Sequence, residues 1–115
     1  MNLKSQVIRN IATLAAALPL ALAAGPASAQ DGPTGLALAQ QENCMSCHSV
    51  THTLMGPALH EIALKYAAKP DAQAYLAHKI VEGSSGVWGN VPMPANTQLN
   101  AVQAAALANW ILTLK

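Results

Sequence analysis

Residues 44–48 read Cys44-Met45-Ser46-Cys47-His48, and the chain of 115 residues contains no other cysteine. Side chains three positions apart on a helix lie about one turn apart on the same face. Both thiols are therefore expected to point to one side, with the imidazole of His48 over the same face. This Cys-x-x-Cys-His spacing is typical of c-type haem attachment, in which two thioethers hold the porphyrin and the histidine binds the iron.

Three other uses of a cysteine pair compete with this interpretation. An exported dithiol can form a disulfide or a thioredoxin-type redox pair, but a thioredoxin motif belongs near a strand–helix–strand pattern, and the sequence has no convincing strand. A zinc site needs four ligands at close spacing. His52 and His60 could be recruited on paper, but their spacing from the cysteines matches no common zinc pattern. Haem attachment is therefore the favoured interpretation.

The first residues of the chain have the features of an export signal. Lys4 and Arg9 form a short positive region, an apolar run covers residues 11–24, and residues 27–29 read Ala-Ser-Ala. A positive start, an apolar centre and small residues before the cleavage point define a secretory signal peptide. We therefore predict that residues 1–29 are removed on export to the periplasm. The alternative is an uncleaved membrane anchor, although the run is shorter than the ~20 apolar residues that a spanning helix needs.

Residues 30–115 are predicted to form a single small domain. They carry four Lys and five acidic residues, which gives a formal charge of −1, so no basic patch for nucleic acid is expected. Their aromatic residues are two Trp and two Tyr, with no Phe. A domain of this size buries only a modest core, and a large covalent cofactor would supply the missing apolar bulk.

The apolar periodicity of this domain predicts an all-α fold of about four short helices. A first helix is expected over residues 34–43, with Asp31 as its cap and Pro33 in its first turn. Two further helices are indicated by apolar stripes at helical spacing, and Gly56-Pro57 and Gly83 mark their outer limits. These stripes are Leu59, Ile62, Ala63 and Tyr66, and then Ala72, Tyr75, Leu76 and Ile80.

A long loop and a last helix complete the predicted fold. Residues 83–99 lack periodicity, and a loop of this length is usually functional or disordered. Trp88, Pro92 and Pro94 indicate that its second part is held in place. Asn100 is the expected cap of the last helix, whose buried face comprises Leu107, Trp110, Ile111 and Leu114.

A haem iron bound by His48 needs either a second protein ligand or an open position. The candidates are Met45, Met55, Met93, His52, His60 and His78. Met93 is favoured, because it lies far along the chain between two prolines that restrict its backbone. A ligand on a stiff loop loses little entropy when it is held on a metal. The alternative for Met93 is a core filler, and the histidines on predicted helices are expected to face solvent.

Residues 44–48, 55–58 (Met-Gly-Pro-Ala) and 86–94 (Gly-Val-Trp-Gly-Asn-Val-Pro-Met-Pro) form a distinctive series, to which Trp110-Ile111-Leu112 adds. In this order and spacing they resemble the small monohaem class I cytochromes c of the bacterial periplasm. The resemblance implies a cytochrome c fold, with about four short helices wrapped around one covalently attached haem c.

The resemblance also implies how this chain would hold the haem. Cys44 and Cys47 would carry it through thioethers, and His48 and Met93 would be the axial ligands of its iron. The carbonyl of Pro57 would accept the Nδ1–H of His48, a bond that fixes the ring and tunes its basicity.

Further residues match the family more loosely, and two positions depart from it. Asn96 resembles an amide donor near the methionine sulfur, Trp88 resembles the indole that bonds an inner haem propionate, and Lys79 stands where relatives often place a cation near a propionate. Ala39 stands where relatives often carry an aromatic residue facing the last helix. Met45 is larger than the residue of some relatives and is expected to refill that space.

The activity implied by the resemblance is electron transfer, not catalysis. His/Met ligation leaves no open position for a substrate, and the sequence offers no nucleophile–base pair or paired carboxylates. The family's partners include membrane cytochrome complexes as donors, with nitrite reductase and terminal oxidases as acceptors. They would dock briefly at the exposed haem edge of a monomer that is not inserted in the membrane. The alternative is a haem-based gas-binding or sensor protein with a displaceable sixth ligand.

Overall fold

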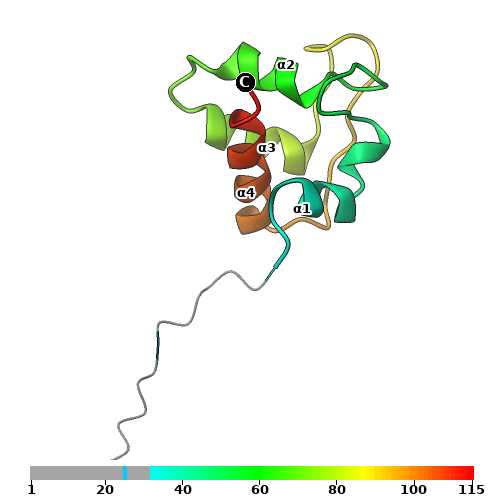
Figure 1. The fold of residues 1–115 in the computed structure, drawn as a ribbon. Helices are drawn as coiled ribbons and strands as arrows, with labels where there is room; N and C mark the ends of the chain where they lie inside the picture. Colours follow the sequence, from blue (N-terminus) through cyan, green and yellow to red (C-terminus); the bar gives the residue numbers. More distant parts are fainter. Residues whose placement is uncertain (1–24, 26–31) are drawn as a thin grey trace, which may run out of the picture. The chain divides into compact units, whose positions relative to one another are not determined.

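The computed structural model describes residue 25 and residues 32–115. These residues form α1 (Gly35–Gln41), the 3₁₀ turn η1 (Cys44–Ser46), α2 (Leu59–Tyr66), α3 (Ala72–Glu82) and α4 (Ala101–Leu112) (Figure 1). Within the described residues, β-type pairing is limited to an isolated bridge between Ser84 and Met93. The predicted all-α fold of about four short helices is therefore confirmed. The predicted signal peptide, apart from Gly25, and the predicted cap Asp31 lie outside the described residues.

The last helix, α4, packs against α1, α2 and α3. A capping box closes its N-terminus: the Asn100 side chain accepts the N–H of Gln103 at 2.9 Å, and the Gln103 side chain accepts the N–H of Asn100 at 3.1 Å. The predicted cap and the predicted burial of Leu107 and Ile111 are confirmed. Trp110 and Leu114 are only partly buried, and Leu114 lies beyond the end of the helix.

The apolar stripes of α2 and α3 face the core as their spacing predicts. All four stripe residues of α2 are buried. In α3, Ala72, Leu76 and Ile80 are buried, whereas Tyr75 is partly exposed. Gly83 ends α3 with φ +82° and ψ 177°, a region of backbone space that only glycine occupies readily. The predicted stop at Gly83 is therefore confirmed.

The helices of the described part are short, from 7 residues in α1 to 12 in α4. Helices of this length are marginal alone and are stabilised mainly by packing an apolar face against neighbours. No helix among residues 32–115 combines the length and the apolar character that crossing a membrane requires.

The first helix is shorter than predicted, and its contact with α4 is made differently. It covers Gly35–Gln41 and not residues 34–43. The predicted cap Asp31 and the predicted place of Pro33 in the first turn are wrong, because the N-cap is Thr34 and Pro33 precedes the helix. The helix ends early because Asn43 adopts a left-handed φ of +60°. Ala39 is buried, as a small residue in the place of the expected aromatic one. The aromatic residue in this contact belongs to α4 instead. The indole of Trp110 lies over Gly35 of α1, where a Cβ would be 3.2 Å from Cδ1 of the indole.

The cysteine segment was expected to be α-helical, because the spacing of the two cysteines was interpreted on a helix, but it is not. Cys44–Ser46 forms one 3₁₀ turn, and Cys47 follows it with φ −117° and ψ −20°. Side chains at i and i+3 nearly eclipse in a 3₁₀ turn, so the two thiols still lie on one side. Met45, between them, packs against the hydrophobic core.

Candidate haem site

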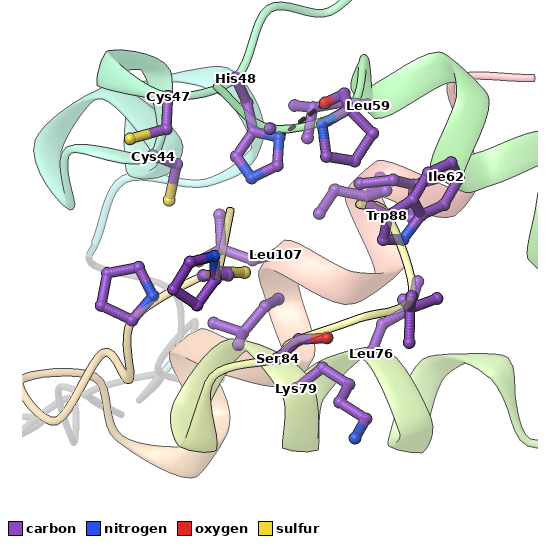
Figure 2. A pocket seen from close by; sticks show the side chains of 18 of the residues that line it. Cys44, Cys47, His48, Leu59, Ile62, Leu76, Lys79, Ser84, Trp88 and Leu107 are labelled. Carbon is purple, nitrogen blue, oxygen red and sulfur yellow. Dashed lines mark hydrogen bonds between the residues drawn. The ribbon is translucent and has the colours of Figure 1, made fainter. Parts of the chain in front are cut away.

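One cavity lies between the cysteine segment, α2, α3, α4 and the loop after α3. Its volume is about 310 Å³, at the lower end of the range for ligand pockets. In Figure 2, Cys44 and His48 project from one wall, and Leu76, Lys79 and Ser84 lie on the opposite side. The apolar part of the lining includes Leu59, Ile62, Leu76, Ile80, Leu107 and Ile111.

The imidazole of His48 is buried and held by the backbone. Only 8% of His48 is exposed, and its Nδ1 lies 2.7 Å from the carbonyl oxygen of Pro57. The Nδ1–H donates this bond, because a carbonyl can only accept. The other ring nitrogen, Nε2, then keeps its lone pair, which is the state in which histidine binds a metal.

Gly56 packs against the same ring. A Cβ on this residue would lie 2.6 Å from Cε1, 3.0 Å from Nδ1 and 3.1 Å from Nε2 of His48. The Gly56 N–H donates to the carbonyl of Cys47 at 2.9 Å, which folds the loop back over the cysteine segment. The sequence marked Gly56 as part of a turn and of the segment 55–58 that carries the family resemblance, but nothing in its spacing reveals which side chain it approaches.

Both cysteines border the cavity and are partly buried. They are not joined to each other by a disulfide. Burial raises the pKa of the Cys44 thiol above its ordinary value, and the nearby charge of Glu42 raises it further. Because the thiolate is the reactive species in thiol–disulfide exchange, and redox cysteines have a lowered pKa, this environment does not suit a thioredoxin-type pair.

Met93 reaches the cavity from the loop after α3. It forms the two hydrogen bonds of the isolated bridge with Ser84, at 3.0 Å and 2.8 Å. A Cβ on Gly83 would lie 2.6 Å from the carbonyl oxygen of Met93, so the loop passes directly over the end of α3. The backbone of Met93 is therefore fixed by the glycine that ends α3 and the serine after it.

Asn96 fastens the same loop at a second point. Its Nδ2 donates to the carbonyl of Ile80 at 2.9 Å, and its backbone N–H donates to the same oxygen at 3.3 Å. An Asn amide carries two hydrogens, so one remains for another acceptor. Donation from Asn96 to the Met93 sulfur, which the resemblance implies, stays a prediction.

Aromatic side chains line part of the cavity, and cationic groups pack against them. The Lys65 ammonium lies 5.3 Å from the ring centre of Trp88, and the Lys79 ammonium lies 5.5 Å from that of Tyr75, within the range of cation–π attraction. Tyr66 and Tyr75 pack with ring centres 5.1 Å apart. Burial, followed by the hydrogen bond with Tyr75, raises the pKa of Tyr66 to about 12. Tyr66 is therefore neutral near pH 7.

The lining by Tyr66 and Tyr75 was not predicted from the sequence, which placed both residues simply in apolar stripes. The scarcity of aromatic residues could have indicated this lining. The chain has four, Tyr66, Tyr75, Trp88 and Trp110, and all of them border the cavity. Trp88 and Lys79, which the resemblance associates with haem propionates, are also among the lining residues. Their hydrogen bonding to a propionate stays a prediction.

The other candidate ligands have different surroundings. His60 donates its Nδ1–H to the carbonyl of Leu114, and His78 pairs with Glu82 at 3.0 Å. His52 contacts the hydroxyl of Thr51 at 2.8 Å. Met55 borders the cavity but is 62% exposed. Across residues 32–115, no three His, Cys, Asp or Glu side chains gather in a way that could hold a metal ion.

Comparison with known proteins identifies the family of this chain. The cytochrome c family model matches residues 34–115. Cytochrome c-552 of Nitrosomonas europaea is 58% identical over 78 residues, which are 68% of this chain and 76% of the relative. Cytochrome c-551 of Stutzerimonas stutzeri is 48% identical over 99 residues, which are 86% of this chain and 91% of the relative.

A solved structure agrees with these sequence matches. The crystal structure of wild-type Nitrosomonas europaea cytochrome c552 has a TM-score of 0.67 at 58% identity, covering 68% of this chain and 96% of that one. The chain is thus a small all-α protein with the fold of these cytochromes. It belongs to the cytochrome c family. The predicted cytochrome c fold and the resemblance to small monohaem class I cytochromes c are confirmed.

Membership of this family implies a covalently attached haem c, and the residues of the cavity fit such a group. The two thiols lie on one wall beside a histidine whose Nε2 is free to bind a metal. Apolar side chains line most of the remaining surface, and Lys79 adds a cationic group to the lining. The donor set therefore suits an apolar macrocycle with an iron and charged edges.

Proposed function

We propose that this cytochrome c carries single electrons, with one haem attached to Cys44 and Cys47 and ligated by His48 and Met93. The observation that carries the proposal is that these four side chains border one largely apolar cavity, although Met93 is remote from the others in sequence. A bound haem supplies an iron that gains or loses one electron, and a methionine ligand raises its reduction potential.

The contribution of this chain is to hold both ligands in place. The Pro57 carbonyl orients the imidazole of His48, and the Ser84 bridge fixes the backbone of Met93. With both ligands fixed by backbone contacts, little rearrangement is needed when the charge in the cavity changes by one. Two protein ligands also leave no position for a substrate, so we infer a carrier and not an enzyme.

Two side chains that line the cavity are suited to the carboxylates of the haem. Trp88 has an indole N–H that can only donate, and Lys79 brings a positive charge to the lining of the same cavity. We assign both to the propionates. Neutral Tyr66 adds no negative charge near these carboxylates.

Electron exchange needs a surface on which a partner can dock beside the cavity. Met55, Val87 and Val91 all border the cavity and are 62%, 44% and 61% exposed. We propose that redox partner proteins dock here transiently. In this proposal residues 1–29 are removed, and residues 30–115 act as a monomer in the periplasm. Donors would be membrane cytochrome complexes, and acceptors would be enzymes such as nitrite reductase or a terminal oxidase.

The absorption spectrum of the haem-loaded protein tests this function. We expect the weak far-red band of methionine–iron ligation in the ferric protein, and poor binding of carbon monoxide to the ferrous protein. Met93→Ala should abolish the band completely and lower the reduction potential, whereas the control Met55→Ala should keep both. A wild-type protein without the band that binds carbon monoxide readily would instead favour a gas-binding or sensor protein.

A further inference from the structure

The contact between Gly56 and His48 has a specific geometry. The position that a Cβ would take on Gly56 is 2.6 Å from Cε1 and nearly equally far, 3.0 Å and 3.1 Å, from the two ring nitrogens. A point in the ring plane beyond Cε1 would be much farther from both nitrogens than from the carbon. The position that a Cβ of Gly56 would take therefore lies over the face of the imidazole.

This contact constrains a motion that the Pro57 hydrogen bond leaves open. The 2.7 Å bond from Nδ1 fixes where that edge of the ring points, but a single hydrogen bond tolerates some twist of the ring. Backbone packed on the ring face limits rotation about the Cβ–Cγ bond directly. The Gly56 backbone is itself fixed, because its N–H bonds to Cys47 and its carbonyl accepts the N–H of Leu54 at 3.0 Å.

We propose that Gly56 is a positioning residue that sets the rotation of the His48 imidazole plane. The inference rests on the proposed function, since it assigns the orientation of a proposed iron ligand. A Cβ at this position has no space unless the ring turns or moves away. Gly56 has no positive φ, so alanine there does not meet the strain of the left-handed region, and the face contact is the main difference between the variant and the wild type.

Proton NMR of the ferric, haem-loaded protein tests the proposal with the variant Gly56→Ala. The plane of an axial imidazole influences how the unpaired electron is distributed over the porphyrin, and hence the spread and order of the four haem methyl shifts. We expect a changed methyl pattern while the far-red methionine band is retained. The control is Gly89→Ala, at φ +112° with no atom within 4 Å, which strains the backbone and should leave the pattern unchanged.

A second measurement uses the wild-type protein and does not depend on the variant folding. In the diamagnetic ferrous state, nuclear Overhauser effects should join the Hα protons of Gly56 to Hε1 of His48. Their absence, or an unchanged methyl pattern in Gly56→Ala, overturns the proposal. A wild-type protein that lacks the far-red band refutes the proposed ligation instead, so the two failures are distinguishable.

Discussion

The two walls of the cavity that carry the proposed iron ligands are built by different kinds of contact. The wall with His48 is closed within one short segment. The backbone N–H of His48 donates to the carbonyl of Cys44 at 3.0 Å, and its Nδ1–H donates to the carbonyl of Pro57. The N–H of Gly56 donates back to the carbonyl of Cys47. The Met93 wall is closed by bonds to the end of α3, through Ser84 and through the contact with Gly83.

This difference indicates which wall depends on the tertiary structure. Nine positions separate His48 from Pro57, and nine separate Ser84 from Met93, so closing either loop costs little chain entropy. The wall with Met93 differs because its loop also bonds to Ile80 within α3 through Asn96, so its placement depends on that helix. Perturbation of α3 is therefore expected to affect the methionine side of the site first.

The largest effect is expected from Cys47→Ala, which removes one attachment point from the local wall. The yield of haem-loaded protein should fall sharply, because a domain of this size has too little core to fold well without its cofactor. A pyridine haemochrome spectrum and haem retention after acid extraction measure the result. Ser46→Ala, at the exposed residue beside it, is the matched control and should retain a normal yield. A stable, folded, haem-free Cys47→Ala protein would contradict the attachment role.

An intermediate effect is expected from Gly83→Ala, which disturbs only the wall with Met93. A Cβ would collide with the Met93 carbonyl, and alanine at φ +82° and ψ 177° costs about 1–3 kcal/mol. We expect partial or complete loss of the far-red ferric band, with haem attachment retained. Gly86→Ala is the control, since Gly86 has φ +80° but no atom within 4 Å. Equal loss of the band in both variants would show that strain alone, and not the contact, is responsible.

The smallest effect is expected from Asn96→Ala, which removes the second fastening of the same loop. The Ile80 carbonyl keeps the backbone N–H of Asn96 as a donor, so the loss is one hydrogen bond, worth about 1 kcal/mol. Urea unfolding monitored at the far-red band measures it. Gln98→Ala removes only a 3.4 Å contact with Asn96 and should have little effect. A loss as large as that of Gly83→Ala would place the main fastening at Asn96.

Local signals in the sequence predicted much of the fold. The stripe of α2 and the cap Asn100 were predicted correctly, because each depends on residues within one or two turns. The extent of α1 was wrong at both ends, and the cysteine segment is a 3₁₀ turn where a helix was expected. Element boundaries depend on single backbone angles, such as the left-handed φ of Asn43, which periodicity does not reveal.

The close contacts at glycine residues could not be predicted from the sequence. Gly35, Gly56 and Gly83 each admit a close neighbour: the Trp110 indole, the His48 ring and the Met93 carbonyl. A glycine in a sequence shows that the backbone can be approached, but not what approaches it. The bridge between Ser84 and Met93 was missed for a related reason, since a single pair of bonds leaves no alternating pattern.

The fluorescence of the two tryptophans would report how far each of them lies from a porphyrin bound in the cavity. Trp88 and Trp110 are the only tryptophans of the chain, and both border the cavity. Indole emission overlaps the absorption of a porphyrin, so a macrocycle in this cavity would quench both residues by energy transfer. As the polypeptide expands, each indole would move away from the acceptor and regain its fluorescence. Trp88 lies on the loop after α3 and Trp110 in α4, so replacing either one by Phe would let the separation of each segment be timed alone.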